Sequence, residues 1–379
     1  MNKVLVITFS NLKTDNRVKR QLSFLKSMNF SITVASNDGF CPEGMQAIQL
    51  KTLRLKLLPK LILSGLLLLR FYSLAYQFLY GQSFRLNETF DLVVANDIEA
   101  LPLAFALKGN AKIIFDAHEY APRHFEDRLS WRIFFQGFNK FLCKKFIPKV
   151  DGMITVGQRI ADEYLKHYGV KPILITNAPD YANVAPTKTN PEKIRLVHQG
   201  SANPSRKLEI MIEMIELLDE KFHLDLMLMK PPPTHRLNYA YYQHLERILS
   251  GNERVRLVPP ISSENLIEGL RQYDIGVIIL PPINFNYANT LPNKFFECIQ
   301  ARVALAIGPT PEIAAITQEY DIGVVSKDFT AQSLAEELRK INVNQIDLFK
   351  INTEKVAKEF NAGNNLKRFT ELIKKVMAD

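Results

Sequence analysis

Cysteine is scarce in this chain of 379 residues, which holds three, at positions 41, 143 and 298. None of the three has a partner at the spacing of a zinc module, and so small and scattered a set gives no disulfide framework. We therefore expect no structural metal and a reducing compartment, of which the cytoplasm is the simplest.

Other signals are missing as well. The chain runs from Met1-Asn2-Lys3 straight into a β-like segment at 4–8, which is too short for the apolar part of a secretory signal. The apolar run around Arg70 is barely long enough to cross a membrane, and the arginine lies in its middle. The chain has no Gly-x-Gly-x-x-Gly motif, no recognised nucleic-acid motif and no repeat of solenoid period. These absences argue against a secreted or membrane-spanning protein, a dinucleotide oxidoreductase and a nucleic-acid-binding protein.

Short apolar strands alternate with amphipathic helices along the whole chain, and this alternation predicts parallel, doubly wound sheets. A length of 379 residues is too great for one ordinary core and suits two α/β domains. A polar, proline-containing stretch predicts a linker at 177–192, between a first domain at 1–176 and a second at 193–355. The strands are expected at 4–8, 32–35, 92–95, 113–115, 153–156, 173–175, 196–198, 224–229, 256–258, 275–279, 304–307 and 324–325.

The net charge of +9 is unevenly distributed. Residues 1–150 hold 21 Lys and Arg against 11 Asp and Glu, whereas residues 151–379 hold 27 against 28. Two basic segments, 51–80 and 131–149, also contain many apolar or aromatic residues, a composition that suits a helix on an anionic membrane surface. The alternative is a helix that covers the core and lays its Lys and Arg stems along the edge. Both interpretations stay open for a helix at 51–80, and membrane contact is favoured at 131–149.

The stretch Asn-Thr-Leu-Pro-Asn-Lys-Phe-Phe-Glu at 289–297 follows a buried strand and opens a helix. Backbone N–H groups at a helix start attract phosphate. A carboxylate at Glu297 could accept hydrogen bonds from two vicinal hydroxyl groups, as a ribose offers. The stretch therefore predicts a nucleoside diphosphate site. The residues expected there are Asn289, Leu291, Pro292, Asn293, Lys294 and Glu297.

A second turn in the same half supports this site. The strand at 194–198 runs into Gln-Gly-Ser-Ala-Asn-Pro-Ser-Arg-Lys at 199–207. Gly200 allows close backbone approach to a phosphate, and Arg206 or Lys207 can neutralise a departing diphosphate. The alternative is a surface loop with ordinary solvated charges.

Polar residues also follow the strands of the first half. The strand at 113–115 ends in Asp-Ala-His-Glu at 116–119, and a histidine there can bond a sugar hydroxyl, although a structural histidine is the alternative. Asp15 is placed to cap a helix after the first strand. Either Asn96 or Asp97 could do the same after the strand at 92–95.

In their order along the chain, these segments resemble the nucleotide-sugar glycosyltransferases known as glycosyl transferases group 1. The resemblance covers Asp-x-Arg-Val at 15–18, Asp-x-His-Glu at 116–119, the Gly200 turn and the stretch ending at Glu297. Asn289 stands at the first of the family's two glutamates, and Ser201 at a phosphate-binding arginine. The resemblance implies an α/β fold with two Rossmann-like doubly wound parallel-sheet domains that face each other across a cleft, the GT-B type.

The resemblance also implies individual roles. His118 would approach the donor sugar, and Lys207, with Arg206 as a substitute for the arginine missing at Ser201, would act on the phosphates. Glu312 would border the donor sugar. A C-terminal helix at 356–379 would return to the first domain. The acceptor-side candidates are Asp15, Arg17, Asp116 and Glu119.

The activity implied is transfer of a sugar from a nucleotide-diphosphate sugar to an acceptor hydroxyl, with retention, without metal and without a cofactor other than the nucleotide sugar. The basic, aromatic surface suggests a lipid-linked saccharide of bacterial surface polysaccharide synthesis as acceptor. The protein would then be peripheral on the inner face of the cytoplasmic membrane. A catalytically silent nucleotide-binding relative and a nucleotide-sugar epimerase of similar architecture remain as alternatives.

Overall fold

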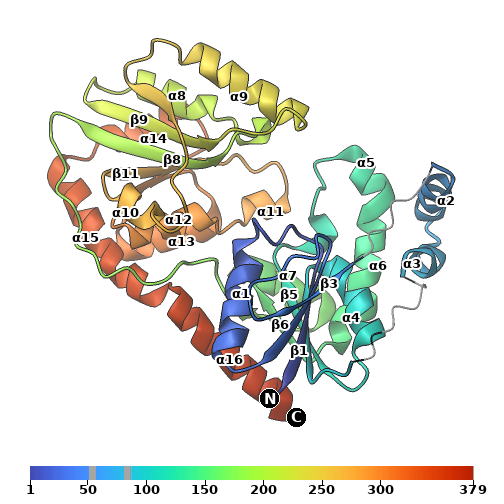
Figure 1. Ribbon diagram of the computed structural model, residues 1–379. Helices are drawn as coiled ribbons and strands as arrows, with labels where there is room; N and C mark the ends of the chain where they lie inside the picture. Colours follow the sequence, from blue (N-terminus) through green and yellow to red (C-terminus); the bar gives the residue numbers. More distant parts are fainter. Residues whose placement is uncertain (51–56, 81–85, 87, 379) are drawn as a thin grey trace. The chain divides into compact units, whose positions relative to one another are not determined.

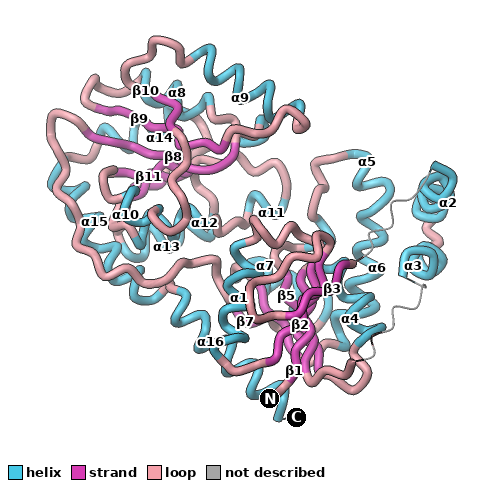
Figure 2. Tube along the Cα trace, viewed as in Figure 1, coloured by secondary structure: helices cyan, strands magenta, loops and turns pink. Residues whose placement is uncertain are grey.

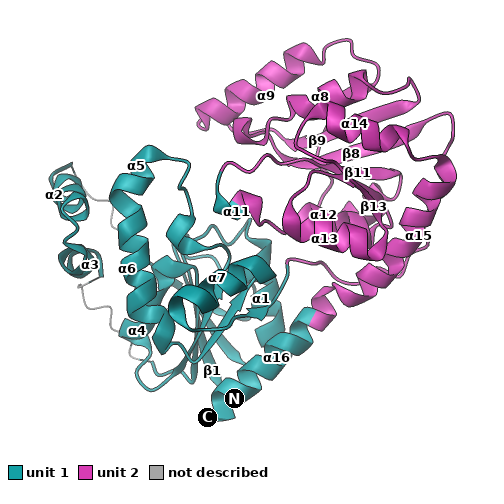
Figure 3. Ribbon diagram, turned by 180° about the vertical axis from the view of Figure 1, so that it is seen from behind, with its two compact units in different colours: residues 1–176, 284–286, 365–379 teal, residues 177–283, 287–364 magenta. Residues whose placement is uncertain are grey.

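The chain folds into two compact units, each built around one parallel sheet (Figures 1 and 3). Unit 1 comprises residues 1–176, 284–286 and 365–379, and unit 2 comprises residues 177–283 and 287–364. The prediction of two Rossmann-like α/β domains is thus confirmed. The computed structural model describes residues 1–50, 57–80, 86 and 88–378.

The sheet of unit 1, whose strands are magenta in Figure 2, has the strand order β3-β2-β1-β4-β5-β6-β7. Its paired strands are all parallel within the described residues. The order reverses between β1 and β4, and ligands of doubly wound sheets bind beyond the carboxyl ends of the strands at such a switch. The strands are β1 (Lys3–Thr8), β2 (Ser31–Ser36), β3 (Gln46–Gln49), β4 (Leu92–Asn96), β5 (Lys112–Ala117), β6 (Gly152–Thr155) and β7 (Ile173–Leu174).

The helices of unit 1 include α1 near the N-terminus and part of α16 at the C-terminus. Helix α1 starts after Asp15, whose carboxylate accepts hydrogen bonds from the N–H groups of Arg17 and Val18, so the predicted N-cap is confirmed. Part of α16 belongs to this unit, and its Phe369 ring lies 6.3 Å from that of Phe24. The helical segments are α1 (Asn16–Ser27), α2 (Leu57–Leu68), α3 (Tyr72–Tyr80), η1 (Ile98–Ala100), α4 (Leu101–Leu107), η2 (Ala121–Arg123), α5 (Leu129–Trp131), the π-helical η3 (Arg132–Gln136), α6 (Gly137–Phe146), η4 (Ile147–Lys149), α7 (Gln158–Tyr168) and α16 (Ala362–Ala378).

The expectation of one helix over 51–80 was wrong. Helices α2 and α3 are separated by a turn in which Arg70 has a φ of 61°, a left-handed conformation that ends a helix. Residues 51–56 lie outside the described ranges. None of the helices that the structure describes is long and apolar enough to cross a membrane.

The sheet of unit 2 has the order β10-β9-β8-β11-β12-β13, again with parallel pairs throughout its described strands. Its switch lies between β8 and β11. The strands are β8 (Ile194–Ser201), β9 (Phe222–Met229), β10 (Val255–Val258), β11 (Ile275–Ile278), β12 (Ala304–Ile307) and β13 (Gly323–Val325). The helical segments are η5 (Pro204–Arg206), α8 (Glu209–Glu216), α9 (Arg236–Ile248), α10 (Leu266–Leu270), α11 (Phe285–Ala288), whose first two residues belong to unit 1, α12 (Asn293–Gln300), α13 (Pro311–Tyr320), α14 (Ala331–Arg339) and α15 (Val343–Glu359).

Candidate functional site

Unit 2 gathers most of the predicted nucleotide-binding residues at one edge of its sheet. Strands β8, β11 and β12 are parallel neighbours, so their carboxyl ends lie at the same edge. Gly200 lies near the end of β8, Glu297 in α12, the second helix after β11, and Glu312 in the first turn of the helix that follows β12. This is the edge at which a doubly wound sheet binds its ligand.

Two cationic side chains lie over the backbone of Gly200. A Cβ atom at this position would be 2.6 Å from Nη1 of Arg206 and 3.2 Å from Nζ of Lys294, so only glycine leaves room for both groups. The guanidinium group is held over the turn because Nη1 also donates to the carbonyl oxygen of Ser201 at 3.3 Å. A guanidinium and an ammonium group beside the backbone of a half-buried glycine form an arrangement suited to phosphate.

Lys294 is unusual among lysines because it is 8 % exposed. Its Nζ lies 3.1 Å from Nε2 of His198, and Nδ1 of that imidazole lies 2.8 Å from the carbonyl oxygen of Val277. Burial and the Arg206 guanidinium lower the pKa of Lys294 well below its usual value, while the Glu297 carboxylate acts in the opposite direction. Burial, Lys294 and Arg206 likewise lower the pKa of His198.

Glu297 is oriented by Gln199, whose Nε2 donates to Oε2 of the carboxylate at 2.6 Å. Neither Gln199 nor His198 was predicted from the sequence as a site residue. They directly precede Gly200 on β8 and are 8 % and 1 % exposed. Polar side chains inside an otherwise apolar strand need partners, and that pattern was the signal available in the sequence.

The remaining predicted residues of unit 2 differ in their surroundings. Asn289 and Leu291 are buried, Pro292 is half-buried and precedes the first residue of α12, and Asn293 is exposed. Lys207 is exposed at a left-handed backbone position with φ 47°. The structure therefore brings Lys294, and not Lys207, beside Gly200. A phosphate role for Lys207 stays a prediction.

Substitution of Gly200 with alanine should lower the free energy of unfolding by more than the backbone alone explains. The φ of +149° costs a non-glycine residue about 1–3 kcal/mol, and the new methyl group must also displace Arg206 and Lys294. Gly251→Ala is the matched control, because Gly251 has φ +80° but no atom within 4 Å of the place that a Cβ atom would occupy. Urea unfolding of both variants measures the difference, and equal losses would contradict the crowded arrangement over Gly200.

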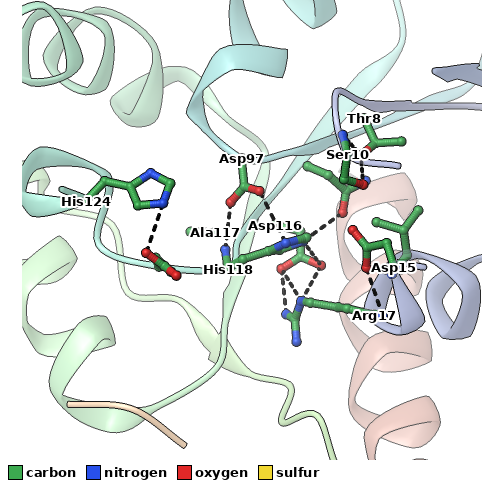
Figure 4. A network of polar contacts seen from close by, with 12 residues as sticks. Thr8, Ser10, Asp15, Arg17, Asp97, Asp116, Ala117, His118 and His124 are labelled. Atoms are coloured by element: carbon green, nitrogen blue, oxygen red, sulfur yellow. Dashed lines mark hydrogen bonds and ion pairs between the residues drawn. The ribbon is translucent and has the colours of Figure 1, made fainter. Parts of the chain in front are cut away.

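In unit 1, Arg17 and Asp116 form a buried ion pair (Figure 4). Nη2 of Arg17 lies 2.5 Å from Oδ1 of Asp116, and the two side chains are 9 % and 2 % exposed. Nη1 of the same arginine donates to the carbonyl oxygen of Ile175 at 2.7 Å, and Nε2 of Gln21 donates to Asp116 at 3.0 Å. Two acceptor-side candidates thus bind each other, which joins α1 to the end of β5.

His118 lies at the same sheet edge and is held by the loop after β4 (Figure 4). Its Nδ1 is 3.2 Å from Oδ2 of Asp97, and its Nε2 is 3.2 Å from Oδ1 of Asn96. Asp97 also accepts the backbone N–H of His118 at 3.1 Å. The Asp97 side chain therefore does not cap the helix that follows, and the polar pair orients the imidazole. A role of His118 toward the donor sugar stays a prediction.

The carboxyl groups of Asp97, Glu99 and Glu119 interact with one another at this edge. Burial, Asp97 and Glu99 raise the pKa of Glu119 to about 7, while a hydrogen bond from Asn286 opposes the shift. Burial and Asp97 also raise the pKa of Glu99 to about 7. The carboxyl groups of Glu99 and Glu119 therefore hold a proton more readily than an ordinary glutamate does. No group of three or more His, Cys, Asp or Glu side chains within the described ranges is placed to hold a metal ion.

Residues 284–286 belong to unit 1 although the chain on both sides belongs to unit 2. Tyr120 donates its backbone N–H to Oδ1 of Asn286 at 2.9 Å, and Phe285 donates its own to Glu126 at 2.8 Å. The Phe285 and Tyr120 rings are 5.3 Å apart. This short segment is thus firmly bound within unit 1.

A basic pocket of about 570 Å³ lies between α6 and α7 of unit 1. Lys140 and Lys144 lie one turn apart on α6 and are exposed. Arg123 adds positive charge, His167 also lines the pocket, and Glu163 is the acidic residue of the lining. The pocket therefore suits an anionic group.

In comparisons with known proteins, a family model matches part of the chain, and solved structures share its fold. Residues 17–180 match the model of Glycosyltransferase Family 4. No curated protein sequence matches the chain. Sucrose-phosphate synthase from Thermosynechococcus elongatus has a similar structure, with a TM-score of 0.74, 14% identity and complete coverage of both chains.

Two further solved structures are similar. HepE from Anabaena, in complex with UDP and glucose, has a TM-score of 0.65 at 13% identity, over 99% of this chain and 100% of that one. A TarM variant from S. aureus, in complex with UDP and other ligands, has a TM-score of 0.64 at 9% identity, over 98% and 99%. At these identities the similarity establishes the fold, which is the GT-B type.

Proposed function

We propose a specific reaction for this chain from one premise: it is a nucleotide-sugar-dependent glycosyltransferase of the group 1 type, with the GT-B fold. The reaction moves a sugar from a nucleoside-diphosphate sugar, bound by unit 2, to an acceptor hydroxyl at unit 1. The observation that carries the proposal is the cluster of Gly200, Arg206, Lys294 and Glu297 at the switch of the second sheet. It combines two phosphate-binding cations with a ribose-binding carboxylate.

The donor is proposed to be a UDP-sugar. HepE and TarM were solved with UDP, and their similarity to this chain makes UDP the first nucleotide to try. In the proposed complex Glu297 accepts hydrogen bonds from the ribose hydroxyls while Gln199 holds the carboxylate in place. The diphosphate lies against Gly200, where backbone can approach closely.

Catalysis is proposed to be mainly electrostatic. Charge develops on the diphosphate as the sugar leaves, and Arg206 and Lys294 stabilise it from preorganised positions. These cations can supply the charge that a divalent metal supplies elsewhere, so we propose transfer without metal and without a further cofactor. The configuration at the sugar is proposed to be retained, with the leaving phosphate assisting deprotonation of the acceptor.

The acceptor is proposed to be an anionic, lipid-linked saccharide of a bacterial surface polysaccharide pathway. The basic pocket between α6 and α7 offers Arg123, Lys140 and Lys144 to a phosphate group. Large apolar side chains are exposed on α2, on the following turn, on α3 and on α5 and η3. These are Leu57, Leu58, Leu61, Ile62, Leu68, Leu69, Phe71, Leu74, Leu129, Ile133 and Phe135. A patch that mixes such residues with basic ones suits peripheral contact with the inner face of the cytoplasmic membrane.

The membrane contact makes a quantitative prediction. Replacement of Leu61 and Ile62 with serine should weaken binding to vesicles of phosphatidylglycerol and phosphatidylcholine by about 100-fold or more, because each buried aliphatic side chain contributes about 1.5–3 kcal/mol and the two together at least about 3 kcal/mol. Leu237→Ser is the matched control, since Leu237 is 80% exposed but lies on α9 of unit 2. Co-sedimentation measures binding. Equal binding by wild type and the double variant would rule out this surface.

Thermal-shift measurement of the wild-type protein with UDP, GDP, ADP, CMP and NAD tests the donor site. A nucleoside diphosphate at about 100 times its Kd should stabilise the protein by about 2.7 kcal/mol. Stabilisation by UDP, followed by slow hydrolysis of a UDP-sugar, is the expected result. A response to NAD alone, or to no nucleotide, would contradict the proposal. UDP binding without hydrolysis or transfer would instead favour a catalytically silent relative.

A further inference from the structure

We propose that His198 is a positioning residue, which holds the ammonium group of Lys294 against the diphosphate of the donor. The inference rests on the proposed function, because it requires a nucleoside diphosphate at this edge of the second sheet. His198 lies inside the sheet and acts through Lys294, so it does not need to touch the substrate itself.

The hydrogen-bond partners of His198 determine its tautomer. Nδ1 lies 2.8 Å from the carbonyl oxygen of Val277, which can only accept, so Nδ1 carries the proton. Nε2 then has a lone pair, and it lies 3.1 Å from Nζ of Lys294, which donates when charged. Burial and two neighbouring cations lower the pKa of this imidazole, which keeps Nε2 unprotonated and available as an acceptor.

The imidazole is fixed by the two central strands of the sheet. The β8–β11 ladder pairs Leu196 with Ile275 and Val197 with Gly276. His198 is the next residue along β8, and its side chain continues the connection by bonding the carbonyl of Val277 on β11. It is 1 % exposed. The ring therefore has little freedom, and the direction in which Nε2 points is set by the strands at the switch.

Lys294 needs such a fixed partner because its surroundings compensate its charge poorly. Arg206 on η5 repels the ammonium group, while Glu297, which lies on α12 as Lys294 does, attracts it, and the Cys298 thiol lies nearby. With burial included, the charged form of Lys294 is disfavoured. An arriving β-phosphate supplies the missing negative charge. One N–H of Lys294 bonds His198, which leaves the others able to donate toward Gly200, where a phosphate can approach.

The contribution of the β-phosphate is measured by the ratio of UMP to UDP dissociation constants. Isothermal titration calorimetry should give a ratio for His198→Phe about 10-fold lower than for wild type, with UMP affinity unchanged. His198→Gln, whose side-chain oxygen can accept a hydrogen bond, should recover part of the ratio. If the Phe variant does not fold, His198→Ala and His198→Gln give the same comparison. Lys294→Met shows the ratio that remains without the ammonium group.

A double-mutant cycle separates positioning from a structural effect. If His198 acts through Lys294, the ratio for His198→Phe with Lys294→Met should equal that for Lys294→Met alone. Additive losses, or equal weakening of UMP and UDP by His198→Phe, would overturn the proposal for His198 and leave the donor site standing. Failure of the wild type to bind UDP or UMP would overturn both proposals together.

Discussion

Replacement of Glu297 with alanine should weaken UDP binding by about 100-fold or more and abolish measurable sugar transfer. The carboxylate is proposed to accept two ribose hydroxyl groups, and each hydrogen bond to a charged group contributes about 1.5–3 kcal/mol. A loss of about 3 kcal/mol corresponds to a change of more than 100-fold in Kd. Calorimetric titration of the variant with UDP measures the effect.

Two controls make the Glu297 result specific. Glu319→Ala removes an exposed carboxylate from α13 of the same unit and should leave UDP affinity unchanged within about twofold, as for surface substitutions generally. Inorganic pyrophosphate has no ribose and should still bind Glu297→Ala, because loss of the carboxylate removes its repulsion of the anion, although it also disfavours the charged form of Lys294. Loss of pyrophosphate binding in the variant would show that the site has collapsed and that the ribose assignment is unsupported.

The second large effect is on stability. Asp116→Ala should lower the free energy of unfolding by about 3–5 kcal/mol, because it leaves the Arg17 guanidinium buried without its carboxylate. The carbonyl oxygen of Ile175 remains as a partner but cannot neutralise the charge. Thermal and urea unfolding, monitored by circular dichroism, measure the loss in the part of the transition that belongs to unit 1.

An exposed pair in the same unit provides the comparison. Lys3 and Glu88 are 2.9 Å apart, with side chains 48% and 32% exposed, so Glu88→Ala should cost about 0–1 kcal/mol. Asp116→Asn keeps the shape and one acceptor oxygen and should fall between the two alanine variants. A loss below about 1 kcal/mol for Asp116→Ala would mean that Arg17 finds water or another partner. Both residues would then again be candidates for binding the sugar acceptor.

Much of the fold could be predicted because both sheets are buried on both faces. Strands such as Val-Leu-Val-Ile within β1 read as continuous apolar runs, and every expected strand is present with ends shifted by at most a few residues. Strand β3 was missed because Gln46–Gln49 is polar and lies at the sheet edge. The break between α2 and α3 was missed because the left-handed residue is Arg70, and arginine, unlike glycine or asparagine, does not indicate such a conformation.

The candidate site could be predicted only where chemistry is local. Gly200 and Glu297 stand out because a glycine turn after a strand and a carboxylate after a helix start are short-range patterns. The contact between Lys294 and His198 joins residues 96 positions apart, and the Arg17–Asp116 pair joins residues 99 apart. No short sequence pattern predicts such pairs, because the two residues come together only when the strands assemble into a sheet. Lys207, the lysine chosen from spacing, is exposed, while the buried lysine lies on another element.

The three-segment composition of unit 1 has a consequence for biosynthesis. Residues 1–176 leave the ribosome first, yet 365–379 complete their unit, with Phe369 against Phe24 and Asn365 bonded to Thr176. At about 5–20 residues per second, the intervening chain takes roughly 10–40 s to synthesise. During that interval the surfaces of α1 and Thr176 that await α16 are uncovered. The unit translated first is therefore finished last, and a chaperone that shields its bare face would act on the nascent chain before termination.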